Sequence, residues 1–433
     1  MLYKKNIKDI LDWLKTRKSK KVDIKQSTFS EMKEWRFDKD SGNLCHNTNR
    51  FFSIIGLEIY TNWGKVNHWK QPIIKQSEIG VLGIIAKYID GKCFFLMQAK
   101  IEPGNINQVQ LSPTFQATKS NYMQVHKGVK PNYCDYFLSN KHKVIVDQLQ
   151  SEQGSRFIKK RNRNIIIEVE EEILVYEDFR WISLDEIFQL LRIDNILNMD
   201  TRTVLSGLLC INNNQKVRSL HTFSSILNWL TRMKTYFELT VNEISLNEIK
   251  NWKIKNDRIH HVDEKYFDIL PIDIYIENRE VKQWSQPMIY PKQEGICAFI
   301  IKRIDGHYHF LVQGKVESGN FDIIEMAPTV QCITGNYKEA YSKSLHYLEY
   351  VLNVESDKII YDVMQSEEGG RFFNEVNRNM IIEADETIII ETPHNYIWMT
   401  LTQIHKLIKF NNFFNIQARS LISAMVLLEN EYN

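Results

Sequence analysis

The segment at residues 150–164 combines groups that bind anions with groups that bind sugars. Its sequence, QSEQGSRFIKKRNRN, holds three arginines, two lysines, four side-chain amides, one carboxylate and one glycine. The planar guanidinium groups of Arg156 and Arg163 suit the oxygens of a diphosphate. The amides of Gln150 and Asn162 suit a ribose, a base or another sugar. The alternative is a structural hydrogen-bond network, which uses the same residue types.

The same frame occurs a second time at 365–379, as QSEEGGRFFNEVNRN. The offset from Gln150 to Gln365 is 215 residues, and other motifs return at that offset. The matching pairs are 69–72 (WKQP) with 284–287 (WSQP), 98–105 (QAKIEPGN) with 313–320 (QGKVESGN), 113–116 (PTFQ) with 328–331 (PTVQ), and 121–122 (NY) with 336–337 (NY). This period is far longer than the repeat of a solenoid, so the pattern predicts a tandem duplication of one domain.

Two of the repeated motifs add further reactive groups. Trp69 and Gln71 offer an aromatic face and an amide to a base or sugar ring. Lys100 and Glu102 offer a cation and a carboxylate at the end of a predicted strand, and Gly104 would let the backbone approach a ligand closely. The structural alternatives are a core tryptophan in a turn and a surface ion pair beside a turn.

The third motif, at 113–122, offers the hydroxyl of Thr114, the amide of Gln116 and the phenol of Tyr122. A buried tyrosine at a domain junction is the structural alternative.

The elements that would position these groups are strands followed by helices. Asp90-Gly91 predicts the turn of a hairpin over 79–101, and Asp305-Gly306 predicts its counterpart. Further strands are expected at 144–150 and 165–169, and helices at the N-terminus, after Ser183, from Thr201 and over 219–237. Strands with flanking helices predict an α+β fold of the α/β/α sandwich type. We assign the first repeat to 1–218 and the second to 219–433.

Composition excludes several classes of protein. With 433 residues and 43% hydrophobic content, the chain is long enough for two domains. Its net charge of +2 is too small to indicate electrostatic binding to nucleic acid or to an anionic membrane. The six cysteines are scattered without a C-x-x-C pair, and no apolar run could cross a bilayer. P-loop, Rossmann, zincin and nucleophile-elbow motifs are absent. We therefore expect a cytoplasmic protein with no metal, no redox cofactor, no nucleic-acid partner and no membrane partner.

Taken together, the motifs at 69–72, 98–105, 110–118, 120–122 and 150–164 resemble the NDP-hexose 2,3-dehydratases. The resemblance covers nearly the whole chain, including the duplication. It implies a Nudix-hydrolase-like fold in each half, a homodimer, and two nucleotide-sugar pockets per subunit. The Nudix box is absent from both halves, because the acidic run at 168–172 lacks its Arg and Gly frame. Metal-dependent pyrophosphate hydrolysis is therefore not expected.

The resemblance also implies a reaction on dTDP-4-keto-6-deoxyglucose. The ketone at carbon 4 acidifies the proton on carbon 3, the hydroxyl on carbon 2 leaves, and the enol becomes a 3,4-diketo-2,6-dideoxy sugar. A separate NAD(P)H-dependent 3-ketoreductase would consume this product. The elimination needs a base, an acid and donors for the enolate oxygen, but no cofactor. The predicted catalytic residues are Glu102, Tyr122, His126 and, for the enolate, Lys100.

The first repeat also contains the predicted substrate-binding residues. They are Trp69, Gln98, Asn105, Gln116, Asn121, Gln150, Ser151, Arg156, Lys160, Arg161, Asn162, Arg163 and Asn164. The predicted second pocket contains Trp284, Gln313, Lys315, Asn320, Gln331, Asn336, Tyr337, Arg371, Asn377, Arg378 and Asn379.

The repeats diverge at 159–161, where KKR in the first becomes NEV in the second. His126 becomes Tyr341. We therefore expect the main catalytic pocket in the first repeat and a vestigial or structural one in the second. Two other functions fit the motifs: a Nudix-type nucleotide-sugar hydrolase, and a nucleotide-sugar-binding protein without catalytic activity.

Overall fold

The computed structural model describes residues 7–18, 21–123, 130–139, 141–208, 218–277, 281–332 and 345–431, with side chains to residue 425. His126, Asn336 and Tyr337, which the sequence assigns to the two pockets, lie outside these residues. We call the chain up to residue 218 the first half and the remainder the second half.

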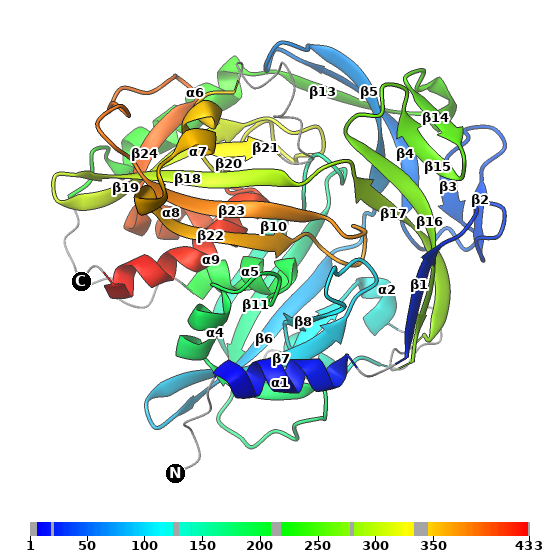
Figure 1. The fold of residues 1–433 in the computed structure, drawn as a ribbon, viewed down its shortest axis with the longest axis horizontal. Helices are drawn as coiled ribbons and strands as arrows, with labels where there is room; N and C mark the ends of the chain where they lie inside the picture. Colours follow the sequence, from blue (N-terminus) through cyan, green and yellow to red (C-terminus); the bar gives the residue numbers. More distant parts are fainter. Residues whose placement is uncertain are drawn as a thin grey trace.

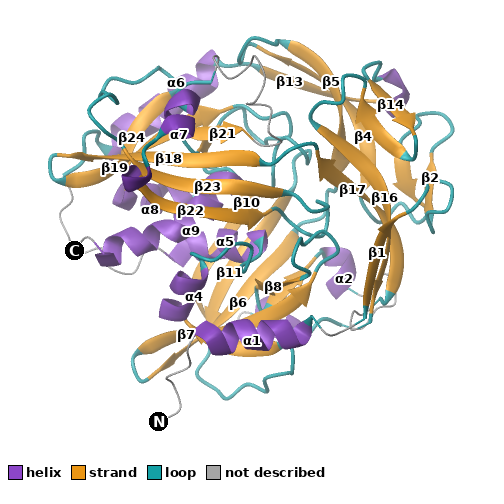
Figure 2. Ribbon diagram, viewed as in Figure 1, coloured by secondary structure: helices purple, strands orange, loops and turns teal. Residues whose placement is uncertain are grey.

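Two seven-stranded mixed sheets with the same strand order dominate the fold (Figures 1 and 2). The first runs β10 (Lys143–Ser151), β11 (Arg161–Glu168), β6 (Gly80–Ile89), β7 (Lys92–Ile101) and β12 (Phe179–Ser183), with β8 (Val109–Ser112) on β7 and β9 (Phe115–Ala117) on β6. The second runs β22 (Ile359–Ser366), β23 (Val376–Glu383), β18 (Gly295–Ile304), β19 (His307–Lys315) and β24 (Tyr396–Thr400), with β20 (Glu325–Ala327) on β19 and β21 (Val330–Cys332) on β18. The parallel registers also correspond: Asn162 lies opposite Gly80, and Asn377 lies opposite Gly295.

Both predicted hairpins are confirmed. β6 pairs with β7, and β18 pairs with β19, each pair in antiparallel register. Asp90 and Gly91 have φ of 49° and 75°, and Asp305 and Gly306 have φ of 50° and 84°. Positive φ at both central residues is the conformation of the tight turn that suits strand twist, and Asp-Gly adopts it at low cost.

The predicted helices at the N-terminus and between the halves are also present. α1 (Ile7–Arg17) buries Ile10 and Leu14 against the first large sheet. α6 (Phe223–Tyr236) buries Trp229 and Met233 against the second. Ser183 and Glu186 form a reciprocal capping box at the start of α4 (Leu184–Leu190), as the sequence predicts.

The remaining helices are short except for the last. They are α2 (Lys119–Tyr122), α3 (Cys134–Leu138), α5 (Met199–Leu205), α7 (Leu348–Asn353), α8 (Leu401–Ile408) and α9 (Ile416–Glu431), with single 3₁₀ turns at Ser206–Leu208, Leu246–Glu248 and Ser356–Lys358. α5 of the first half packs on α9 of the second. Within the described residues, no helix is long and apolar enough to cross a membrane.

Two five-stranded antiparallel sheets join the halves by exchanging strands (Figure 1). One contains β2 (Trp35–Phe37), β3 (Leu44–His46), β4 (Ser53–Thr61) and β5 (His68–Lys75), and the other contains β14 (Trp252–Lys255), β15 (Arg258–His261), β16 (Phe267–Ile276) and β17 (Gln283–Pro291). β13 (Leu239–Ile244), from the second half, pairs with β4, and β1 (Val22–Gln26), from the first half, pairs with β16. Each half therefore completes a sheet of the other.

The two small sheets meet in a shared apolar core. Phe52 and Trp35 from one side and Phe267 and Trp252 from the other contribute to it. The rings of Phe157 and Phe372, one from each repeated segment, contact edge to face with centroids 5.9 Å apart. The repeated segments 150–164 and 365–379 therefore lie where the halves join.

Candidate functional site

Each repeated segment contains a turn that its own asparagine ties to the neighbouring strand. The backbone N–H of Glu152 donates to the carbonyl of Lys160 at 2.9 Å, and the Asn162 amide donates to the Glu152 carboxylate. The Asn162 carbonyl oxygen accepts from the N–H of Gly80 at 3.2 Å. The same three contacts recur in the second half, with Asn377 in the place of Asn162. The fixed spacing of the motif therefore places the residues whose hydrogen bonds hold this turn.

The turn of each half is held against a strand-end loop of the other half. Gly104 donates its N–H to Gly369 at 2.7 Å and accepts from Asn374 at 2.9 Å. A Cβ on Gly104 would lie 1.6 Å from the carbonyl oxygen of Phe372. The close backbone approach that the sequence predicted for a ligand at Gly104 is made by the other half of the protein. Gly319 approaches the first half in the same way, because a Cβ on Gly319 would lie 1.8 Å from the carbonyl oxygen of Phe157.

Buried arginines cross the same junction. Arg202 donates to the carbonyl of Ser366 at 2.7 Å and to the side chain of Gln365 at 3.1 Å. Its counterpart Arg419 donates to the carbonyl of Ser151. Burial lowers the pKa of Arg202 and of Arg419 to about 10, so both keep their charge at neutral pH.

A carboxylate cluster lies at the end of β7, within hydrogen-bond reach of β9 and α5. The Gln116 amide donates to Glu102 at 2.8 Å, and the Lys100 ammonium lies 3.5 Å from the same oxygen. The Asn198 amide donates to Gln116 at 3.2 Å and lies 3.5 Å from the other Glu102 oxygen. We call Lys100, Glu102, Gln116 and Asn198 the Glu102 cluster. It places a buried carboxylate beside a cation, as base chemistry next to an enolate requires.

The second half contains a matching set, Lys315, Glu317, Gln331 and Asn415, which we call the Glu317 cluster. Gln331 donates to Glu317 at 3.0 Å, and Asn415 donates to Gln331 at 2.6 Å. Lys315 donates to the backbone carbonyl of Gln331 at 3.0 Å. Burial raises the pKa of Glu317. Asn198 and Asn415 were missed by sequence reasoning, although each is the N-terminal cap of its helix, α5 or α9.

Glu78 brings a further group of predicted residues together. It accepts from the Ser120 hydroxyl at 2.7 Å, and its backbone carbonyl accepts from the Lys160 ammonium. Tyr122 is half-buried nearby, and burial raises its pKa. Burial lowers the pKa of Lys160 to about 8. The sequence analysis did not identify Glu78. The one available signal was that its counterpart in the second repeat, Gln293, is not a carboxylate.

Several predicted substrate-binding residues have partners inside the protein. Arg163 forms a two-point ion pair with Asp147, with both contacts at 2.7 Å, and Arg378 forms the same pair with Asp362. Arg161 lies over the ring of Phe321 at 4.0 Å. A contact of these arginines with a diphosphate would have to replace or share these partners.

The tryptophan motifs support the repeated turns. Trp69 donates to Gln71 at 2.8 Å, and Gln71 donates to the carbonyl of Ser155 at 3.1 Å. Trp284 and Gln286 make the same pair of contacts, which end at the carbonyl of Gly370.

The other predicted residues are distributed along the same junction. Gln150 donates to the carbonyl of Ile408, Ser151 to Glu325, Asn105 to the carbonyl of Gln108, Asn164 to Thr203, and Asn379 to the carbonyl of Asn377. Gln98 lies on β7 opposite Ser112, Gln313 is buried on β19, and Asn121 is exposed on α2. Both side-chain polar atoms of Asn320 are buried, with no hydrogen-bond partner among the described residues.

Burial raises the pKa of seven carboxyl groups along the junction. The pKa rises to about 8 for Glu325 and Glu375, to about 7 for Glu367 and Glu368, and in the same direction for Glu152, Glu317 and Asp200. Both oxygens of Glu375 and one of Asp200 have no hydrogen-bond partner among the described residues. Some of these groups therefore hold protons near neutral pH, which suits proton transfer.

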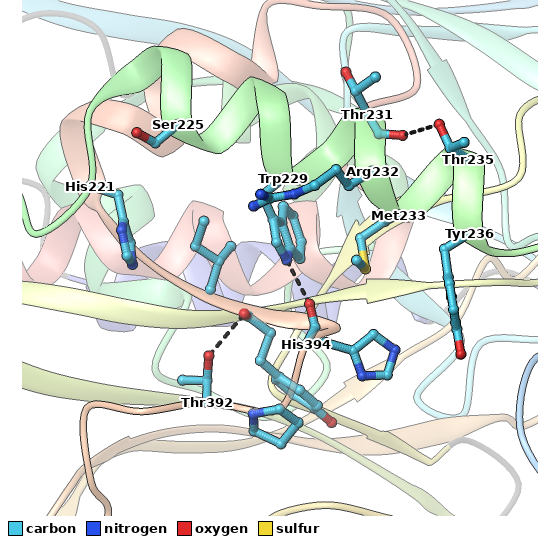
Figure 3. A pocket seen from close by; sticks show the side chains of 13 residues that line it. His221, Ser225, Trp229, Thr231, Arg232, Met233, Thr235, Tyr236, Thr392 and His394 are labelled. Atoms are coloured by element: carbon cyan, nitrogen blue, oxygen red, sulfur yellow. Dashed lines mark hydrogen bonds between the residues drawn. The ribbon is translucent and has the colours of Figure 1, made fainter.

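An open groove of about 900 Å³ lies elsewhere, between α6 and the segment 392–397 (Figure 3). Its walls include His221, Trp229, Arg232, Tyr236 and His394. It contains no carboxylate and shares no residue with either cluster. At the equivalent place in the first half, Arg17 forms an ion pair with Asp178 at 3.4 Å. The groove lacks the acid–base pairs of the junction, so the Glu102 cluster is the better candidate site.

The residues that the structure describes contain no group of three or more His, Cys, Asp or Glu side chains that could hold a metal ion. The five cysteines among them are free thiols. Cys210 lies outside them.

Comparison with known proteins gives consistent similarities. A sequence model described as NDP-hexose 2,3-dehydratase matches residues 7–208 and again 223–425. A protein of Saccharopolyspora spinosa is 42% identical over 422 residues, covering 92% of this chain and 86% of its own length. One of Streptomyces violaceoruber is 40% identical over 412 residues, covering 93% of both. One of Amycolatopsis orientalis is 38% identical over 425 residues, covering 96% of this chain and 89% of its own length.

All three relatives are named dTDP-4-dehydro-6-deoxy-alpha-D-glucopyranose 2,3-dehydratase. Among solved structures, an ADP compounds hydrolase matches 38% of this chain and 88% of its own, with 12% identity and a TM-score of 0.26.

Proposed function

The chain belongs to the NDP-hexose 2,3-dehydratase family, and on that premise we propose that it eliminates water from dTDP-4-keto-6-deoxyglucose to give the 3,4-diketo-2,6-dideoxy sugar nucleotide. Family membership over nearly the whole chain supports the substrate, because three relatives carry that substrate in their names. The enzyme is accordingly a carbon–oxygen hydro-lyase.

The elimination moves two protons and breaks one carbon–oxygen bond, and the tautomerisation that follows moves two more protons. A base takes the proton from carbon 3, and negative charge develops on the oxygen at carbon 4. The carbon 2–oxygen bond then breaks, and an acid protonates the departing hydroxyl to give water. The remaining enol takes a proton at carbon 2, loses the proton of its hydroxyl at carbon 3, and becomes the diketone.

The observation that carries the assignment is the Glu102 cluster. The Glu102 side chain is almost fully buried, yet donors from three elements fix its orientation. A buried and oriented carboxylate is suited to take the carbon 3 proton, and the adjacent Lys100 is suited to stabilise the enolate oxygen. Tyr122 and His126 are the proposed acids, and Tyr122 lies in the same half beside Glu78.

We assign catalysis to the first half. Asp200 interacts electrostatically with Glu102 and Lys100, and Lys160 donates to the backbone carbonyl of Glu78 in the same half. The second half has Gln417, Gln293 and Glu375 at the corresponding positions. At these three positions the first half has three ionisable side chains and the second half has one. The second half keeps the hydrogen bonds of the cluster, which fits a structural or vestigial pocket.

The repeated strand order and the double match of the family sequence model support a tandem duplication. We propose that it comprises two Nudix-hydrolase-like domains of the α/β/α sandwich type, at 1–218 and 219–433. We further propose a homodimer in the cytoplasm. The diketo product is reactive, so an NAD(P)H-dependent 3-ketoreductase should follow in the same route to a deoxysugar.

One assay tests the proposal. The protein is incubated with dTDP-4-keto-6-deoxyglucose, with and without EDTA, and the diketone is trapped chemically or with a ketoreductase. Trapped diketone that forms equally well with EDTA is the expected result. Release of dTMP would indicate a hydrolase instead, and binding without turnover would indicate a nucleotide-sugar-binding protein.

A further inference from the structure

We infer that Arg371, which belongs to the second half, is a positioning residue for the Glu102 cluster of the first half. The inference rests on the proposed function of that cluster. It differs from the assignment that the repeat alone predicts, which places Arg371 in a second pocket and Arg156 in the first.

The backbone carries Arg371 to the Glu102 loop. Gly369 and Asn374 flank the arginine on its turn, and both hydrogen-bond to Gly104, two residues after Glu102. The contact is too close for any side chain at Gly104, since a Cβ there would lie 2.8 Å from the Gly369 oxygen and closer still to Phe372. The arginine turn and the glutamate loop are therefore fixed to each other by main-chain contacts.

The Arg371 side chain is enclosed. Its guanidinium lies over the ring of Phe52 at 4.1 Å and donates to the carbonyl of Gly370 at 2.8 Å. Its Nε is buried with no hydrogen-bond partner among the described residues. A cation that is stacked and enclosed in this way has little freedom to find another counter-ion.

Carboxylates from both halves face this cation. Arg371 interacts electrostatically with Glu368, Glu102, Glu152 and Glu78. Three of these four belong to the first half, so a residue of the second half supplies positive charge to the proposed catalytic half. The charge favours the ionised forms of Glu152 and Glu368, whose pKa values it lowers against the effect of burial.

Arg156 makes the reciprocal arrangement. Its guanidinium lies over Phe267 at 4.2 Å and faces Glu375, Glu317 and Glu367 of the second half. The positions that correspond to Glu78 and Glu368 are Gln293 and Gln153 there. Removal of Arg156 should therefore destabilise the second half without changing the pH dependence of the proposed catalytic site in the first half.

The expected consequence of removing Arg371 is a change in pH dependence. Loss of one nearby positive charge raises the pKa of a carboxyl group by about one unit or more. The groups that interact with Arg371 or with its partners are Glu78, Lys100, Glu102, Glu152, Lys160, Asp200, Glu367, Glu368 and Arg419. More of the carboxyl groups would be protonated at a given pH, so the acid limb of the rate profile should move to higher pH.

The experiment compares Arg371→Gln, Arg371→Lys and Arg156→Gln in the full-length protein. For each variant, kcat/KM for dTDP-4-keto-6-deoxyglucose is measured from pH 5 to 9, and the unfolding temperature is measured by circular dichroism. Arg371→Gln should move the acid limb upward by about one pH unit. Arg371→Lys should return the limb toward the wild-type position, because it restores the charge. Arg156→Gln should lower the unfolding temperature comparably without moving the limb.

The inference is overturned if Arg371→Gln changes only the unfolding temperature, or if Arg156→Gln moves the limb as far. Failure of the proposed function would be seen separately, as absence of turnover by the wild-type enzyme. If Arg371→Gln does not fold, the pH profiles of kcat/KM for Arg371→Lys and Arg156→Lys are compared instead. A lower kcat/KM for Arg371→Lys, with its acid limb at the same pH, supports the inference. Identical profiles for the two variants contradict it.

Discussion

Substitution of Gly104 by alanine tests the contact between the halves directly. The added Cβ would lie 1.6 Å from the carbonyl oxygen of Phe372, whereas real Cβ contacts stay above 3.0 Å. The backbone of one half must therefore move by more than 1 Å. The neighbouring atoms are main chain, so no rotamer change can relieve the overlap.

The magnitude follows from two contributions. Forced overpacking costs about 1–3 kcal/mol. The displacement also weakens the hydrogen bonds of Gly104 with Gly369 and Asn374, each worth about 0.5–1.5 kcal/mol. The free energy of unfolding should fall by about 2–6 kcal/mol. Gly104 does not have a positive φ in the left-handed range, so backbone strain does not add to this cost.

Urea unfolding monitored by circular dichroism measures the effect. Gly314→Ala is the matched control, because the nearest atoms to its Cβ belong to side chains at 3.2 Å or more. Gly319→Ala should behave like Gly104→Ala, since its Cβ would lie 1.8 Å from the Phe157 carbonyl oxygen. Equal stability of Gly104→Ala and Gly314→Ala would refute the interlocked junction.

Three further predictions follow from buried polar groups. Burial raises the pKa of Glu325 from 4.5 to about 8, so the folded state loses stability as the pH rises between these values. In urea unfolding, Glu325→Gln should have a higher free energy of unfolding than wild type, and the difference should be larger at pH 8.5 than at pH 5, by up to about 1.4 kcal/mol per pH unit. A difference that does not depend on pH would contradict the burial of this carboxyl group. Arg202→Ala should cost about 3–5 kcal/mol in the same assay, because it leaves the Ser366 carbonyl and buried carboxyl groups without their cation, and a loss under 1 kcal/mol would count against the network. Asn198→Ala and Asn415→Ala should each lose about 1 kcal/mol of stability as helix caps, but only Asn198→Ala should also lower kcat at least tenfold; equal effects on kcat would argue against the first half as the active one.

Local sequence signals predicted several of the elements correctly, but not the strands of the two five-stranded sheets. The Asp-Gly turns, the capping box at Ser183 and the apolar spacing of the N-terminal helix each depend on neighbouring residues, and each has the expected conformation. The exchange of β1 and β13 was not predictable in this way. β1 is only partly buried and short, and nothing in its sequence specifies whether its partner is β4 or β16.

The repeated polar segments show why site prediction from sequence was harder. Both a ligand site and a buried polar interface need donors and acceptors at fixed spacing, since each buried polar group requires a partner. In the structure, Asn162 and Arg202 satisfy groups of the protein itself. Glu102, Gln116 and Lys100 were predicted individually, and they do lie together. Asn198 joins them from a helix 82 residues beyond Gln116 in sequence, which no local pattern could indicate.

The assignment of catalysis to the Glu102 cluster is the central claim, and the elimination rates of Glu102→Gln and Glu317→Gln test it most directly. Rates are measured with dTDP-4-keto-6-deoxyglucose deuterated at carbon 3, by following loss of deuterium together with formation of trapped diketone. Glutamine keeps the size and one hydrogen-bonding oxygen at each site but cannot accept the proton. Glu102→Gln should lose about 10²–10⁴-fold in rate, and Glu317→Gln should lose less than tenfold. Equal losses, or a larger loss for Glu317→Gln, would contradict the account.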